Sequence, residues 1–108
     1  MRQYQIELDQ NVVTYIERLN YEYETLKDNV AYMVQHFDQR FLEGDLFRQY
    51  QDRQIRARIN FEQGREEIYE KFVPEKLKQH RINWQIDYRR RLLIVTQFCD
   101  CEVDDETK

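Results

Sequence analysis

The chain has 108 residues, of which 35% are charged and 14% aromatic, and its formal net charge at pH 7 is −4. This aromatic content excludes an intrinsically disordered chain, and the presence of only two Gly and one Pro disfavours a β fold with many turns. No apolar run in the sequence is long enough to span a membrane, and the first residues lack the apolar core of a signal peptide. We therefore expect a cytoplasmic protein that does not contact a membrane.

The first predicted elements are a strand and a long helix. Apolar residues alternate at positions 4, 6 and 8, which predicts a half-buried strand over residues 3–8. A heptad repeat follows and predicts a helix over residues 9–40, with Asp9 or Asn11 as its cap. The repeat consists of Val12, Ile16, Leu19, Tyr23, Leu26, Val30, Met33 and Phe37.

A second helix is predicted from Asp45 to about Val73. Gly44 is expected to stop the first helix in a left-handed conformation, Asp45 to cap the second, and Pro74 to end it. Its heptad stripe consists of Phe47, Tyr50, Gln54, Ala57, Phe61, Gly64 and Ile68. A short connection between helices of similar length predicts an antiparallel hairpin. Whether the two helices pack within one chain or exchange between chains stays open.

The second helix carries another apolar line, which one neighbouring helix cannot cover together with the heptad stripe. It consists of Ile55, Ile59, Tyr69 and Val73. Either the sheet or a second copy of the chain must cover it, and we interpret it as an interface.

The rest of the chain predicts a β-hairpin. Residues 74–80 form a connector of about one helical turn, and apolar alternation then predicts strands near 82–88 and 92–99, with arginines at the turn. The fold class is therefore α+β, mainly α: a long antiparallel helical hairpin with a small antiparallel sheet. We expect one domain over residues 1–101 and a flexible acidic tail over residues 102–108.

Two cysteines, Cys99 and Cys101, stand where the last strand meets the tail. They imply no disulfide framework in a reducing compartment. They are candidate zinc ligands, but a closed zinc site needs four ligands, and one chain adds only His36 or His80. A dimer could supply four cysteines. The other interpretation is an ordinary strand end, and we predict no cofactor.

Arginines gather on the second helix and at the hairpin turn. Those on the helix have acidic neighbours in sequence and predict a salt-bridged, solvated face. Arg89, Arg90 and Arg91 belong to a basic segment, 74–98, between acidic ones, and are the predicted contact for an acidic partner. Because the sequence pI is about 5.2, we do not expect direct binding of nucleic acid.

The eight tyrosines are the remaining interaction signal. Tyr23 and Tyr50 fall on the heptad stripes and are predicted core residues, whereas Tyr15, Tyr21 and Tyr32 lie off the stripe. Tyrosine is enriched at protein interfaces, so these last three are candidate interface residues, with ordinary exposed tyrosine as the alternative.

No catalytic pattern is present in the sequence. The chain has no serine, two distant histidines, and neither a Gly-rich phosphate loop nor a zinc-protease motif. We therefore predict that the protein is not an enzyme.

Two short motifs carry a resemblance: ERLNYE at residues 17–22 and WQIDY at residues 84–88. With the opening strand and the closing hairpin, they resemble small uncharacterised proteins encoded by phages and mobile elements of Firmicutes. The resemblance implies a virion component or an accessory phage protein, and it implies no activity or cofactor.

The sequence supports one leading function and two alternatives. The leading one is a structural or assembly protein that self-associates, or docks on another protein, through its helix faces. The second is a small acidic inhibitor or adaptor, which would bind a basic, nucleic-acid-binding surface of a host protein through its acidic side chains. These are Glu17, Glu24 and Asp28 on the first helix and Asp100, Glu102, Asp104, Asp105 and Glu106 near the end of the chain. The third is a zinc-stapled dimer.

Overall fold

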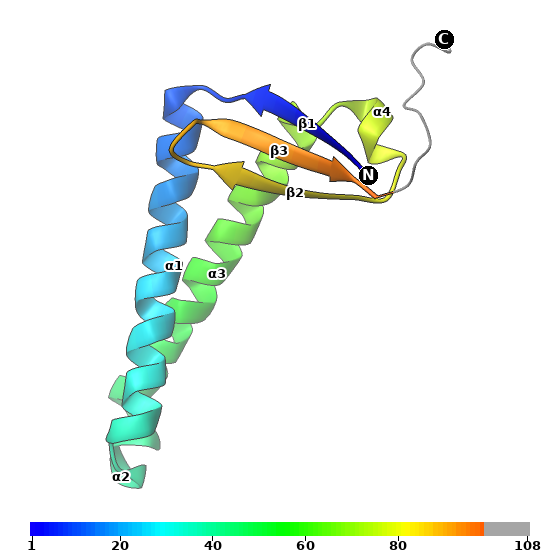
Figure 1. Ribbon diagram of the computed structural model, residues 1–108. Helices are drawn as coiled ribbons and strands as arrows, with labels where there is room; N and C mark the ends of the chain where they lie inside the picture. The colour runs from blue at the N-terminus through cyan, green and yellow to red at the C-terminus, as the bar shows by residue number, and fades with distance from the viewer. Residues whose placement is uncertain (99–108) are drawn as a thin grey trace. The chain divides into compact units, whose positions relative to one another are not determined.

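The computed structural model describes residues 1–98 and has the predicted α+β, mainly α architecture. Its elements are β1 (Arg2–Glu7), α1 (Gln10–His36), α2 (Gln39–Leu42), α3 (Asp45–Phe72), α4 (Glu75–Lys78), β2 (Ile82–Asp87) and β3 (Leu92–Gln97) (Figure 1). They form two compact units. Tyr15–Arg65 is the helical unit, and Met1–Thr14 joins residues 66–98 to make the sheet unit.

The helical unit is an antiparallel hairpin in which α1 and α3 of the same chain pack together (Figure 1). Both heptad stripes face inward, as the sequence predicts: Ile16, Leu19 and Val30 are buried on α1, and Phe47 and Ala57 on α3. Burial of each large aliphatic side chain contributes about 1.5–3 kcal/mol. The tyrosines of the stripes are half-buried.

Contacts between the two helices fix how they pair. The rings of Tyr23 and Phe61 stack with centroids 6.1 Å apart. One turn further along α3, Gly64 is buried against the side chains of Ile16 and Leu19. The missing side chain at Gly64 therefore lets α1 approach the α3 backbone, as its position on the stripe predicts.

The connection between the helices differs from the prediction. α1 ends at His36, and Asp38 begins the short α2 because its side chain accepts a hydrogen bond from the Phe41 N–H at 3.0 Å. Gly44 does not have a positive φ, so the expected left-handed stop is wrong. Its carbonyl instead accepts from the Arg48 N–H in the first turn of α3. Asp45 is therefore a first-turn residue, where its charge suits the helix dipole.

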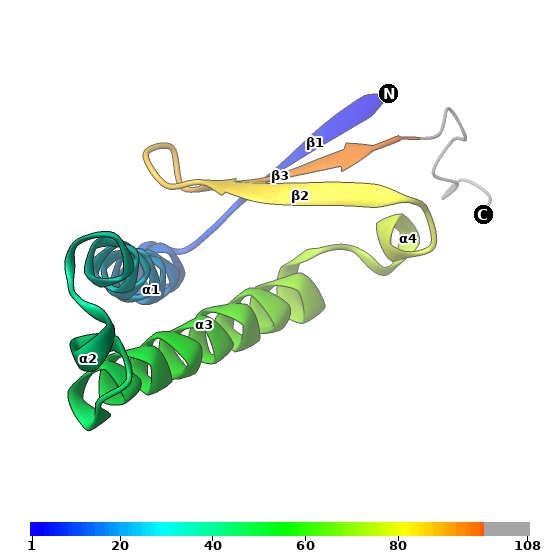
Figure 2. The same cartoon turned by 90° about the horizontal axis from the view of Figure 1, so that it is seen from below.

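The sheet unit contains a three-stranded antiparallel sheet in the order β1-β3-β2. Its alternate residues form two faces. Leu93, Val95 and Gln97 are fully buried on one face of β3, whereas Leu92, Ile94 and Thr96 are half-buried on the other. Tyr4 of β1 donates its hydroxyl proton to the buried Gln97 Oε1 at 3.3 Å. Figure 2 shows α4 on one side of this sheet, where Leu77 is buried.

Pro74 separates α3 from α4. It has an extended ψ of 144° at the N-cap of α4, and its ring disfavours helical geometry at the residue before it. α3 therefore ends at Phe72, close to the predicted position.

Candidate functional site

Two isoleucines stand exposed in the middle of α3. Ile55 and Ile59 are one helical turn apart, and their exposed fractions are 48% and 43%. Each therefore keeps nearly half of its surface open to solvent, although β-branched apolar side chains of this size are usually buried. We call Ile55 and Ile59 the isoleucine pair. They are the half of the predicted apolar line that is open to a partner.

The other half of that line is not open, and its prediction as an interface needs correction. Val73 is 3% exposed, and the ring of Tyr69 stacks on Trp84 of β2 with centroids 6.2 Å apart. The sheet unit itself therefore covers Tyr69 and Val73, which was one of the two coverings that the sequence leaves open.

The three tyrosines proposed for an interface are all exposed. Tyr21 is 71% exposed, and Tyr15 and Tyr32 are also on the surface of α1. Tyr32 stacks on His36 with ring centroids 4.1 Å apart, and the Tyr32 carbonyl lies 3.0 Å from His36 Nδ1. Tyr32 is therefore held in place by its own helix, whereas no comparable contact from residues 1–98 fixes Tyr21.

An exposed apolar cluster at the tip of the hairpin was not predicted. Phe37 was expected in the core but is exposed, and its ring meets Phe41 edge-on with centroids 4.7 Å apart. Phe41 in turn packs on the buried Phe47, and Leu46 nearby is exposed. Because the heptad pattern does not show where α1 ends, it could not place Phe37 beyond that end.

The arginines of α3 contact both acidic side chains and aromatic rings. Arg48 pairs with Asp45 at 3.0 Å. Arg53 lies over the ring of Tyr50, 5.3 Å from its centroid, and Arg65 similarly lies over Phe61. Both are cation–π contacts. The guanidinium groups of this helix therefore cover aromatic rings of the stripe as well as pairing with acids.

The turn between β2 and β3 holds two of the three hairpin arginines in fixed contacts. Asp87 accepts hydrogen bonds from the Arg90 side chain at 2.8 Å and from the Arg90 N–H at 3.1 Å. These bonds lower the pKa of the Asp87 carboxyl below its ordinary value. Arg91 has a φ of 57°, in the left-handed region, and donates to Gln10 Oε1 at 3.1 Å. Of the three arginines predicted to contact an acidic partner, Arg90 and Arg91 are thus held by these bonds, and Arg89 is exposed.

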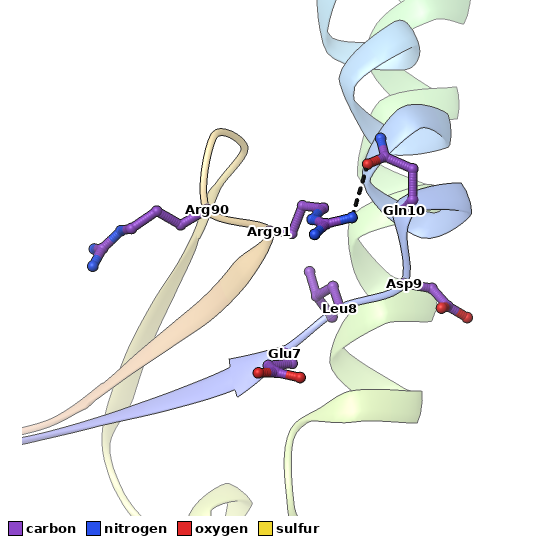
Figure 3. A pocket seen from close by; sticks show the side chains of 6 residues that line it. All are labelled: Glu7, Leu8, Asp9, Gln10, Arg90 and Arg91. Atoms are coloured by element: carbon purple, nitrogen blue, oxygen red, sulfur yellow. Dashed lines mark hydrogen bonds between the residues drawn. The ribbon is translucent and has the colours of Figure 1, made fainter.

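A polar pocket of about 300 Å³ lies beside this turn (Figure 3). Its lining residues are Glu7, Leu8, Asp9, Gln10, Arg90 and Arg91. Figure 3 shows the Arg91 side chain reaching Gln10, while Arg90 extends away from both. Two carboxylates and two guanidinium groups in an open notch favour neither an anion nor a cation. We therefore interpret the pocket as the place where the β2–β3 turn attaches to the start of α1.

Lys78 is a tightly held residue that sequence reasoning missed. Its side chain is 11% exposed, and its ammonium lies 3.1 Å from Glu75 Oε2 and 3.6 Å from Glu70 Oε1. It also donates to the Glu70 carbonyl in the last turn of α3 and lies over the Tyr69 ring. Burial opposes its charge, but the bond to Glu75 and the charge of Glu70 outweigh burial and raise its pKa. Lys78 therefore joins α3 and α4.

A line of acidic side chains on α1, which we call the acidic line, faces solvent. Glu17, Tyr21, Glu24 and Asp28 are spaced at helical intervals that bring them to one side of the helix. Glu24 pairs with Lys27 at 3.2 Å. Glu17 and Asp28 are exposed. The line therefore presents negative charge around an exposed aromatic ring.

The predicted zinc ligands Cys99 and Cys101 lie outside the described residues. Among residues 1–98 no cluster of three or more metal-ligating side chains is present, and no helix there is both long and apolar enough to cross a membrane.

Comparison of the chain with protein-family models, with curated proteins and with solved structures found no match in any of the three.

Proposed function

We propose that the protein is a non-enzymatic structural or assembly protein that self-associates through α3. The isoleucine pair carries this proposal, because exposed apolar residues one turn apart form a contact stripe for another helix. The exposed tyrosines of α1 supply further contact area. The resemblance to phage-encoded proteins supports a place in a virion, or in the cytoplasm during its assembly.

A charge placed within the isoleucine pair tests this function. Ile59→Asp would have to bury an unpaired carboxylate in the interface, so the assembly should dissociate. Because Ile59 is already exposed in the single chain, the melting temperature of the helical unit should change little. Light scattering gives the mass in solution, and circular dichroism gives the melting temperature.

Asn60→Asp is the matched control, since it adds the same charge at an exposed position of α3 that lies about 100° around the helix from Ile59. The control should keep the wild-type mass. If a folded Ile59→Asp protein keeps the wild-type mass, α3 is not the interface. A parallel measurement with a chelator separates this interface from a zinc-stapled dimer.

A second function, an acidic inhibitor or adaptor, is favoured by the acidic line on α1. Glu17 and Asp28 are exposed carboxylates flanking Tyr21, and such a line suits a basic protein surface. A labelled oligo-arginine peptide is the probe. Binding should weaken steeply as salt rises and should be lost in Glu17→Gln/Asp28→Gln, whereas Glu62→Gln/Glu66→Gln on α3 should bind normally. Equal binding by both double variants would contradict this function.

A further inference from the structure

The edge strand β1 has a row of backbone groups that point away from the sheet. Leu8 N–H donates to the Arg91 carbonyl at 2.9 Å, one position beyond the last paired residues of β1 and β3. In an antiparallel ladder, hydrogen-bonded and non-hydrogen-bonded positions alternate. Tyr4 and Ile6 therefore bond to β3 in the same way as Leu8, and the backbone groups of the residues between them face outward. These residues are Gln3, Gln5 and Glu7.

The other edge of the sheet confirms this alternation. Phe98 N–H donates to the Arg81 carbonyl at 3.0 Å. Counting back from Phe98 along β3, Thr96, Ile94 and Leu92 thus bond to β2. The remaining positions of β3 bond to β1, which agrees with the assignment from Leu8.

Within residues 1–98 no strand pairs with the outer edge of β1, and its charged side chains, Arg2 and Glu7, stand only at its two ends. The backbone groups of Gln3, Gln5 and Glu7 have no backbone partner within the described residues. The strand has neither a proline nor a lysine, and its register against β3 is continuous from Arg2 to Glu7, without a bulge. Proteins usually block exposed edges with these devices, because an open edge is a template for another strand.

We propose that β1 pairs with β1 of a second copy in antiparallel orientation, so that two sheets join into one. For the buried faces of the two sheets to lie on the same side, each residue whose backbone groups point out of the sheet must lie opposite another such residue. In the register centred on Gln5, all three of these residues find a partner: Gln5 lies opposite Gln5, and Gln3 opposite Glu7. Each such pair exchanges two backbone hydrogen bonds.

The side chains of β1 complement one another in this register. The carboxylate of Glu7 meets the amide of Gln3, and no like charges stand opposite. On the other face Tyr4 lies opposite Ile6, an aromatic and β-branched pair of the kind that stabilises sheets. The strand therefore suits a copy of itself as its occupant.

This inference rests on the proposed function and extends it. The isoleucine pair lies in the helical unit and β1 in the sheet unit, so each chain would carry two separate interfaces. Two different two-fold interfaces on one chain generate an assembly larger than a dimer. The two interfaces can be removed one at a time.

Gln5→Pro removes the outward N–H at the centre of the pairing and leaves the β1–β3 bonds intact, because proline is tolerated at edge positions of this kind. Gln5→Ala keeps that N–H and is the control. By light scattering, the wild type should exceed a dimer, Gln5→Pro and Ile59→Asp should each be dimers, and the double variant a monomer. Gln5→Ala should keep the wild-type mass.

The outcomes separate the two interfaces. A folded Gln5→Pro protein of wild-type mass would overturn the β1 pairing, while loss of mass in Ile59→Asp alone would leave the α3 interface standing. The reverse result would overturn α3 and support β1. A wild-type monomer would overturn both, leaving the edge of β1 for a strand of another protein.

A cross-linking measurement decides the case in which Gln5→Pro does not fold. In a background with Cys99→Ser and Cys101→Ser, Gln5→Cys would place two thiols across the two-fold axis, about 5.5 Å apart at Cα, which suits a disulfide. Gln3→Cys is the control, because its partner in this register is Glu7. Mild oxidation should give a covalent dimer from Gln5→Cys much faster than from Gln3→Cys. Equal rates would overturn the pairing.

Discussion

Gly64 of α3 lies so close to Ile16 of α1 that a Cβ atom on the glycine would come within 3.0 Å of the isoleucine Cδ1 atom. A Cβ atom there would be equally close to Leu19 Cδ1. The two helices therefore meet closely at a residue with no side chain, which sets the first prediction.

A large side chain at Gly64 should force the helices apart. We expect Gly64→Leu to lower the free energy of unfolding by about 1–3 kcal/mol through overpacking. Gly64→Ala should change it by less than about 1 kcal/mol, because the gain in helix propensity offsets the close contact. Gln63→Leu, at the exposed neighbouring position, is the control and should stay within about 0.5 kcal/mol of the wild type. Urea unfolding measures all three; an unchanged midpoint for Gly64→Leu would contradict this packing.

Arg91 occupies a left-handed conformation that glycine adopts more easily. A non-glycine residue there costs about 1–2 kcal/mol. Arg91→Ala and Arg91→Gly both lose the bond to Gln10, but only the glycine variant relieves the backbone. We expect Arg91→Gly to be the more stable of the two by about 1 kcal/mol in chemical unfolding. Equal stability would show that the turn is not strained.

The bonds from Arg90 to Asp87 predict a pH dependence. These bonds lower the folded-state pKa of Asp87, whose ordinary value is 3.8. The stability that they contribute is therefore present above that value and is lost as the pH falls through the lower, folded-state pKa. Asp87→Asn keeps a side-chain acceptor but not the charge. The difference in melting temperature between wild type and variant should be constant near neutral pH and shrink below about pH 4. A difference that persists in acid would contradict the assignment.

Lys78 should stabilise the junction of α3 and α4 more than an ordinary surface lysine does. Lys78→Met removes the contacts to Glu70, Glu75 and the Tyr69 ring. Lys71→Met, at an exposed position in the last turn of α3, is the control. We expect a clearly larger fall in melting temperature for Lys78→Met.

The raised pKa of Lys78 sets the sign of its pH dependence. Its contribution should be complete below the ordinary lysine pKa of 10.5 and decline as the pH rises through the higher folded-state value. Equal melting temperatures for Lys78→Met and Lys71→Met at neutral pH would show that the junction does not depend on Lys78.

The sequence predicts the elements of this fold well, because periodicity reports burial directly. The heptad stripes place α1 and α3, and alternation places the three strands, within a few residues. The end of α1 was missed because Asp38 caps a new helix while Phe37 continues the apolar repeat. Gly44 was misjudged because glycine permits a left-handed conformation but does not require one.

The candidate sites were less predictable because they depend on contacts between distant segments. The sequence shows Ile55, Ile59, Tyr69 and Val73 as one line, and only the contact of Tyr69 with Trp84 divides it. Similarly, Lys78 looks like any charged residue until α3 and α4 bring Glu70 and Glu75 to it. The predicted roles of Arg89 and of the exposed tyrosines stay predictions.

The strand order β1-β3-β2 has a consequence for synthesis on the ribosome. β1 and β2 both bond to β3, which is translated after them. A chain that ends before Leu92 therefore cannot form the sheet, and the backbone hydrogen-bonding groups of β1 and β2 have no β3 strand to pair with. The helical unit is complete once Arg65 has been translated, so it can form earlier. Hence a truncated chain released with its end between Asp87 and Leu92 should be far more prone to aggregate than one that ends soon after Gln97.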